Sequence, residues 1–111
     1  MLKNSGHLEL STAETLDSTD PSTDIDISYA KPGNVVVVGV GPSASPAYQG
    51  VAQVQISLDG TNFVNAPGTS AFTNAAFVYE LTCPAKRVRT YLSTATAGSL
   101  ITLVGVWDER Y

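Results

Sequence analysis

Residues 51–64, which read VAQVQISLDGTNFV, contain the pattern that decides the fold of this chain. In residues 51–58, apolar side chains at every second position alternate with Gln and Ser, which is typical of a half-buried β-strand. Asp59-Gly60 follows directly, and this dipeptide is a strong short-range signal for a β-hairpin. We therefore expect a strand over residues 51–58, a tight turn, and a returning strand over residues 61–64.

Further short strands are predicted on both sides of this hairpin. Alternation or runs of β-branched residues predict strands at residues 8–10, 25–29, 34–40, 76–81, 87–92 and 100–107, separated by Gly, Pro and small residues. Residues 34–40 are almost all valine, so both faces of that strand are expected to be covered. Seven or eight short strands without a helix predict an all-β chain, a single antiparallel β-sandwich, with a small barrel as the alternative.

The first thirty residues differ in composition from the remainder. Six of the ten acidic residues lie there, and residues 11–24 are rich in Ser, Thr and Asp. This composition predicts an extended acidic N-terminal arm with short strands over residues 1–30, followed by the β-sandwich body over residues 31–111. Ser11-Thr12-Ala13-Glu14 fits a capping box, so a helical turn within residues 11–16 is an alternative, although no apolar helical stripe follows it.

Composition excludes several classes of protein. The 111 residues suffice for one domain, and a net charge of -4 with a pI near 4.6 argues against nucleic-acid binding. The single Cys83 and the single His7 exclude a disulfide framework and a His-rich metal site. No apolar run approaches the length of a membrane span, and the N-terminus lacks the apolar core of a signal peptide, so we expect assembly in a cytoplasm.

The chain shows no set of residues for catalysis. It contains no GxSxG, HExxH, P-loop or GxGxxG motif, and no base stands near Cys83, which is expected to be a small buried apolar residue. We therefore predict a protein that is not an enzyme and has neither catalytic residues nor a cofactor or metal. Asp17, Asp20, Asp24 and Asp26 could together hold Ca²⁺, but the EF-hand spacing is absent and a solvated acidic arm is the preferred interpretation.

Basic residues are concentrated at one place, since residues 86–89 hold half of them. Their strand would present a polar face opposite its core face, or would bind the acidic arm of a neighbouring copy through complementary charge. Under the second interpretation, the candidate partner-binding residues are Glu9, Glu14, Asp17, Asp24, Asp26, Lys86, Arg87, Arg89 and Tyr91.

Three segments together resemble a known class of protein. Residues 54–64 have the form Ser-x-Asp-Gly-x-x-aromatic, in which Asp59 and Gly60 provide the turn and Phe63 packs back onto the sheet. Residues 83–92, CPAKRVRTYL, resemble a Pro-Ala-Arg-Tyr-Val-Arg strand, and residues 95–103 resemble a small turn followed by a closing strand. This order is similar to small β-sandwich accessory proteins of tailed-bacteriophage virions. It is also similar to discoidin-like sandwiches, whose length and cysteine pair this chain lacks.

The resemblance implies a non-enzymatic structural virion protein, most specifically a capsid decoration (cement) protein that binds and stabilises the assembled head. The implied partners are the major capsid protein or other virion proteins, but neither nucleic acid nor membrane. Copies are expected to form a homo-oligomer, with a trimer as our prediction, and residues 1–30 to add strands between neighbours. The implied location is the virion, assembled in the host cytoplasm.

The alternative is a carbohydrate- or receptor-binding module, such as a head-fibre or tail adhesion protein. Sugar binding would need exposed aromatic rings beside polar groups. The candidate rings are Tyr48, Phe72, Tyr91, Trp107 and Tyr111, although Trp107 is expected in the core or at its rim.

Overall fold

The computed structural model describes residues 5–17, 19, 21–40, 49–68, 72–73 and 76–110, with the backbone alone for residues 5–7, 96–97 and 108–110. The described residues form ten strands and no helix that could cross a membrane. The strands are β1 (Ser5–Leu10), β2 (Glu14–Leu16), β3 (Ile25–Asp26), β4 (Val35–Val40), β5 (Gln49–Ser57), β6 (Val64–Asn65), β7 (Phe72–Thr73), β8 (Phe77–Leu81), β9 (Arg87–Ala97) and β10 (Leu100–Arg110). This number exceeds seven or eight because four strands are pieces of two or three residues.

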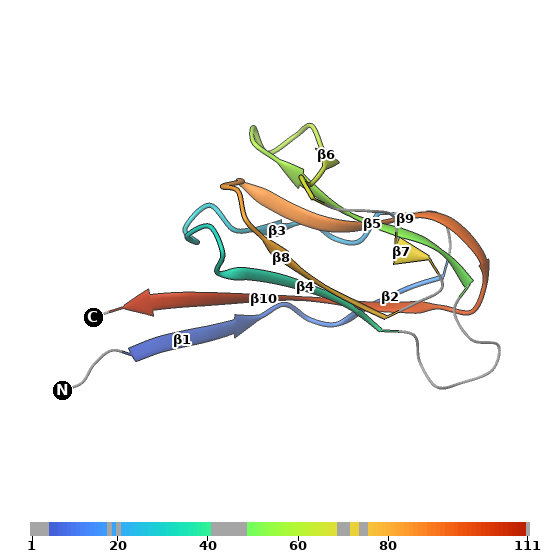
Figure 1. The fold of residues 1–111 in the computed structure, drawn as a ribbon, viewed down its shortest axis with the longest axis horizontal. Helices are drawn as coiled ribbons and strands as arrows, with labels where there is room; N and C mark the ends of the chain where they lie inside the picture. Colours follow the sequence, from blue (N-terminus) through green and yellow to red (C-terminus); the bar gives the residue numbers. More distant parts are fainter. Residues whose placement is uncertain are drawn as a thin grey trace.

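The strands form two antiparallel sheets that pack face to face, which confirms the predicted all-β sandwich. Sheet A has the order β1-β10-β4-β8, with β2 also paired to β10, and sheet B has the order β3-β9-β5-β6, with β7 also paired to β5. In Figure 1, β1 and β10 run side by side in one layer, and β5 and β9 lie in the other. The chain crosses between the layers at the turn from β9 to β10.

The core lies between the sheets and follows the predicted alternation. Val35 and Val37 of β4 and Val54 and Ile56 of β5 are buried in it. Every second residue of β8 is buried too, and in β9 the same alternation holds for Val88, Thr90 and Leu92. Two buried hydroxyl groups cross this apolar layer, because the Oγ1 atoms of Thr90 and Thr102 lie 2.6 Å apart. Cys83 is half-buried and packs at the edge of the core.

The described part of residues 1–30 contributes strands to both sheets. β1 and β2 pair with β10 in sheet A, and β3 pairs with β9 in sheet B. Leu16 and Ile27 are buried in the core, 5% and 2% exposed. The alternative of a helical turn within residues 11–16 is wrong, because the burial of Leu16 and the pairing with β10 place residues 14–16 in a strand. An exchange of this segment between copies remains a prediction.

The predicted hairpin around Asp59-Gly60 is confirmed, because β5 and β6 pair in antiparallel fashion. The tight turn and the returning strand over residues 61–64 are wrong, because β5 ends at Ser57 and β6 begins only at Val64. The intervening loop is held by the Asp59 carboxylate, whose Oδ1 accepts the backbone N–H groups of Thr61 and Asn62 at 2.8 Å each. A side chain that satisfies two backbone donors stabilises this wider loop over a tight turn. The shortest connection between the described strands is instead the turn from β9 in sheet B to β10 in sheet A, where Gly98 has a φ of 71°.

Candidate interaction surface

The outward side of the valine strand is open in this chain. Val35 and Val37 are buried, whereas Val36 and Val38 are half-buried and Val40 is 45% exposed. The prediction that both faces of residues 34–40 are covered is therefore wrong for the chain by itself. Alternate residues of β4 point away from sheet B, and nothing in the described part of the chain lies over them.

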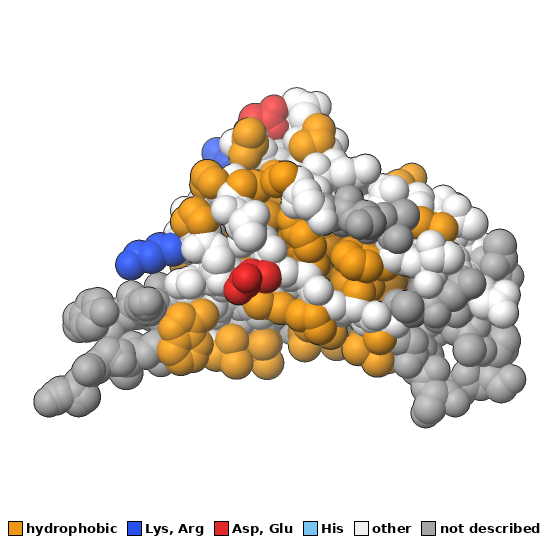
Figure 2. All heavy atoms as spheres, viewed as in Figure 1, with side chains coloured by type: hydrophobic (Ala, Val, Ile, Leu, Met, Phe, Trp, Pro, Cys, Tyr) orange, Lys and Arg blue, Asp and Glu red, His pale blue; other side chains and the backbone are white. Residues whose placement is uncertain are grey.

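The pairing register extends this outward side across four strands of sheet A. Leu8 faces Trp107, Leu103 and Val78 flank Val38, and Ile101 faces Val40. We call the whole surface the outer face, and it consists of Leu8, Leu10, Thr15, Val36, Val38, Val40, Val78, Glu80, Ile101, Leu103, Gly105 and Trp107. It contains neither Lys nor Arg, and its polar residues are Thr15 and Glu80. Figure 2 shows hydrophobic side chains gathered along the lower edge of the molecule, where sheet A lies in Figure 1.

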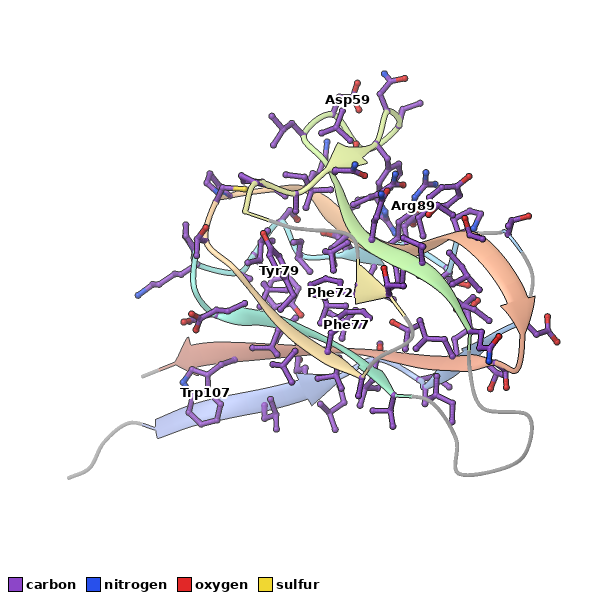
Figure 3. The ribbon with its side chains drawn as sticks, turned by 45° about the vertical axis from the view of Figure 1, so that its right-hand side comes forward. Asp59, Phe72, Phe77, Tyr79, Arg89 and Trp107 are labelled. Atoms are coloured by element: carbon purple, nitrogen blue, oxygen red, sulfur yellow. The ribbon has the colours of Figure 1, made fainter. Side chains whose placement is uncertain are left out.

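Several outer-face side chains are strongly exposed. Val78 is 72% exposed, Leu10 62%, Leu8 55% and Trp107 43%, and Figure 3 shows Trp107 pointing away from the core. Four strands about 4.8 Å apart, over six residue steps of about 3.4 Å, give a face of roughly 400 Å². Contiguous apolar patches of several hundred Å² on a monomer are often functional. We therefore take the outer face as the candidate functional surface.

One end of this surface belongs to a two-stranded ribbon. β4 pairs with β10 only as far as Val106, whereas β1 continues to pair with it as far as Arg110. Figure 1 shows β1 and β10 extending together past the end of β4. Two strands alone are marginally stable in water, so this ribbon also favours a neighbour that covers it.

The basic strand finds its acidic partner within the same chain. Arg87 Nε donates to Asp24 Oδ1 at 2.8 Å, and Arg87 lies opposite Asp26 in the register of β9 and β3. Arg89 Nε donates to Gln55 Oε1 at 2.9 Å, and its guanidinium group stacks over the ring of Phe63 at 4.0 Å. The side chains of Arg87, Arg89 and Tyr91 share the outward side of β9, where a neighbouring copy would meet cations that already have partners.

Of the other candidate residues, Asp26 lies beside this strand, whereas Asp17 and Lys86 stand outside it. Asp26 accepts the hydroxyl and backbone N–H of Ser28, and these two hydrogen bonds lower its pKa. Asp17 and Lys86 are exposed, the former just after β2 and the latter just before β9. The structure therefore brings together Asp24, Asp26 and Arg87, but it does not unite the nine candidates in one patch.

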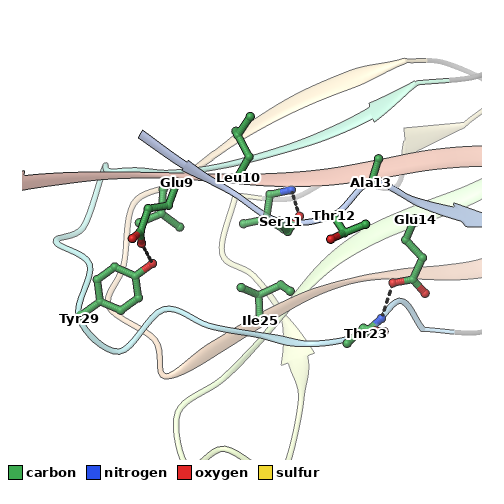
Figure 4. Close-up of a pocket in the computed structure, with 11 residues that line it drawn as sticks. Glu9, Leu10, Ser11, Thr12, Ala13, Glu14, Thr23, Ile25 and Tyr29 are labelled. Atoms are coloured by element: carbon green, nitrogen blue, oxygen red, sulfur yellow. Dashed lines mark hydrogen bonds between the residues drawn. The ribbon is translucent and has the colours of Figure 1, made fainter. Parts of the chain in front are cut away.

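Glu9 and Glu14 stand at the two ends of a cleft of about 760 Å³ between the edges of the two sheets (Figure 4). The hydroxyl of Tyr29 donates to Glu9 Oε1 at 2.6 Å, and the backbone N–H of Thr23 donates to Glu14 Oε1 at 3.0 Å. The lining residues are Glu9, Leu10, Ser11, Thr12, Ala13, Glu14, Thr23, Ile25, Tyr29, Val104 and Val106. Sequence reasoning missed this cleft and Tyr29, because the walls come from strands that only the fold brings together.

Asp59, Gly60 and Phe63, the three residues assigned to the hairpin, shape the loop after β5 or pack next to it. The pKa of Asp59 lies far below its ordinary value of 3.8, because its carboxylate accepts the backbone N–H groups of Asn62 and Thr61 and further side-chain hydrogen bonds. Gly60 has a φ of 88°, a conformation that side chains disfavour. The Phe63 ring is half-buried beneath Arg89.

The described aromatic residues do not form an exposed coplanar platform. Phe72 stacks on Phe77 with ring centroids 4.2 Å apart, but Phe77 is buried. Tyr91 is half-buried, and Tyr48 and Tyr111 lie outside the described residues. Within the described part of the chain, no three His, Cys, Asp or Glu side chains gather as metal ligands. Asp20 lies outside that part, so the four-residue Ca²⁺ hypothesis stays untested.

Comparisons with known proteins add no relative. No protein-family model, curated protein sequence or solved structure matches the chain. The outer face is therefore interpreted from its own chemistry.

Proposed function

We propose that this chain is a non-enzymatic structural protein whose outer face is buried in an assembly, and specifically that it is a capsid decoration protein of a tailed phage. The observation that carries the proposal is the apolar character of the outer face. One side of sheet A already faces the core, so a second apolar side has no use for the folding of a single chain. A sheet that is apolar on both sides is typical of one that is covered on both sides.

Burial of the outer face would supply a substantial driving force for assembly. At about 25 cal/mol per Å², removing roughly 400 Å² of apolar surface from water contributes up to ~10 kcal/mol before the entropic cost of association is subtracted. Valine, leucine and isoleucine side chains on a sheet also lose little conformational freedom when they are covered. Both properties suit a protein that reinforces an existing structure.

The chemistry of the outer face favours a protein partner. Binding to lipid or nucleic acid is usually assisted by Lys and Arg, which the outer face lacks, and the chain has a net charge of -4. The finer part of the proposal, a virion with the major capsid protein as partner, is supported by the resemblance of residues 54–64 and 83–103 to phage accessory modules.

The test is whether the chain belongs to virus particles. Particles of the phage that carries this gene would be purified with and without the gene, and recombinant protein would be added back to the deficient heads. We expect many copies per head in the complete particles, saturable rebinding, and a higher temperature of head disruption after rebinding. Absence of the chain from purified heads, together with no rebinding, would contradict the capsid role.

A second candidate function, saccharide binding, is favoured by the cleft between the sheet edges. Tyr29 is 49% exposed at the end of the cleft where it binds Glu9, and the cleft is also lined by Glu14 and by the hydroxyl-bearing residues Ser11, Thr12 and Thr23. An aromatic ring beside several polar groups suits the apolar and hydroxyl-bearing faces of a sugar. Binding on a glycan array that is lost in Tyr29→Ala would support this function, and an array without any binding would count against it.

A further inference from the structure

We propose that the occupant of the outer face is a second copy of this chain, so that two copies pack outer face against outer face as a symmetric dimer. The inference rests on the proposed function in one respect, namely that the outer face is buried in an assembly. It does not require that the assembly be a virion.

The shape of the outer face suits another sheet. Two β-sheets stack about 10 Å apart when small apolar side chains from both interdigitate, as in the core of a sandwich. The central rows of the outer face carry valine, leucine and isoleucine, and Gly105 lies between Leu10 and Val36 in the register. A Cβ atom at Gly105 would lie 3.4 Å from Leu10 Cδ2 and 3.8 Å from Leu8 Cδ1, so these two side chains lie close to the glycine and keep this part of the face level.

Symmetry makes the second copy the simplest complementary surface. In a two-fold contact the same surface is used by both subunits, so a flat apolar sheet face meets an equally flat apolar sheet face. Glu80, the charged residue of the outer face, lies on the edge strand β8, opposite Val36 of β4 and one strand removed from β10. Its charge can therefore stay at the rim of the contact.

The size of the outer face predicts a weak dimer. Two faces of roughly 400 Å² bury about 800 Å², which is less than the roughly 1,200 Å² of a stable specific interface and belongs with weak, transient contacts. We therefore expect dissociation constants on the order of 1–100 μM. Local concentration on a repetitive assembly would then favour the paired state.

The dependence of association on salt concentration distinguishes this dimer from an exchange of acidic arms. Each copy carries a net charge of -4, so added salt should strengthen a contact between apolar faces by screening repulsion between the copies. A contact between an acidic arm and a basic strand would weaken in salt. The second contact is also less favoured because Arg87 already binds Asp24 of its own chain.

The experiment is sedimentation velocity of the full chain over concentrations from about 1 to 500 μM, at low and high salt. The outer-face variant combines Leu10→Lys with Val78→Lys, two residues that are 62% and 72% exposed. The matched control combines Leu58→Lys with Val64→Lys, which are 70% and 60% exposed away from the outer face. Both variants exchange one Leu and one Val and add the same charge. Circular dichroism at low concentration establishes that both are folded.

We expect the natural chain and the control to dimerise with similar affinity, more strongly in high salt, and the outer-face variant to bind itself at least tenfold more weakly. A natural chain that stays monomeric throughout, a trimer, or an outer-face variant that dimerises like the control would overturn the inference. Flotation of the chain with phosphatidylcholine vesicles would also overturn it, since a lipid would then occupy the outer face.

The two proposals fail separately. A chain that dimerises but never binds heads would contradict the capsid role and leave the dimer standing. A monomeric chain that binds heads through the outer face, with binding lost in the outer-face variant alone, would contradict the dimer and support the capsid role.

Discussion

Thr90 and Thr102 join the two sheets by a hydrogen bond in a core that is mostly apolar. Their side chains are 0% and 4% exposed, and the two Oγ1 atoms lie 2.6 Å apart. Asp59 has a comparable role at the surface, where one carboxylate satisfies the backbone of a whole loop. The threonine pair is buried where an unsatisfied partner would be costly, whereas the Asp59 carboxylate orders an exposed loop.

Replacing Thr90 by Val should lower the free energy of unfolding by about 1–3 kcal/mol, because the Thr102 hydroxyl would be left buried without its partner. The double variant Thr90→Val/Thr102→Val should lose less than the sum of the two single variants, since no orphaned hydroxyl remains. Urea unfolding of the four proteins measures this coupling. Strictly additive losses would show that the hydrogen bond contributes nothing.

The Asp59 carboxylate should make the loop sensitive to acid. Its pKa is lowered in the folded chain, so its contribution to stability is fully present above the ordinary value of 3.8 and is lost as the pH falls toward the folded value. The natural chain should therefore have a higher Tm than Asp59→Asn at pH 7, and the gap should narrow below about pH 4. Thermal unfolding across this range measures the gap. A gap independent of pH would exclude the charge as its cause.

At the scale of elements, the packing of β8 against β4 depends on a glycine, since Gly39 of β4 leaves room for the Phe77 ring of β8. Gly39 lies opposite Phe77, and a Cβ atom built on Gly39 would overlap Cε2 of the Phe77 ring. The ring thus occupies the place where a side chain of β4 would stand, and it stacks there on Phe72 from sheet B. This contact connects the valine strand to both layers.

Gly39→Ala should therefore lower the free energy of unfolding by about 1–3 kcal/mol, because the Phe77 ring must shift within a packed core. Gly105→Ala is the matched control in the neighbouring strand, where the nearest atom is a movable methyl group of Leu10 at 3.4 Å. We expect the control to change stability by less than 0.5 kcal/mol, or about the effect of an ordinary surface substitution. Equal losses in both variants, measured by urea unfolding, would contradict the role of Gly39.

The strands and their core faces could be predicted from alternation where one side is apolar and the other mostly polar, as in β5 and β9. The valine strand could not be assigned in the same way. Both of its sides are apolar, and the sequence alone does not say whether the second cover comes from the same chain. The loop at Asp59 was predicted too tight, because the preference of Asp-Gly for short turns does not reveal that the Asp59 carboxylate binds the backbone of Thr61 and Asn62 in a wider loop.

At the scale of the whole molecule, the outer face was only partly predictable. The apolar residues at positions 8 and 10, in β4 and in β10 were recognised as strand residues, but only the register places them on one surface. The charge pattern suggested a contact between an acidic arm and a basic strand of different copies. The structure closes one such contact within the chain, between Asp24 and Arg87, and leaves the apolar face as the surface open to a partner.

The single tryptophan of the chain reports directly on this surface, since Trp107 lies on the outer face with 43% of its area exposed. The most direct measurement is acrylamide quenching of Trp107 emission, from dilute protein to several hundred micromolar, for the natural chain and for Leu10→Lys/Val78→Lys. If the outer face is buried on association, quenching of the natural chain should fall and its emission should shift to the blue as concentration rises, while the variant stays unchanged. Quenching that is independent of concentration in the natural chain would contradict burial of the outer face between copies.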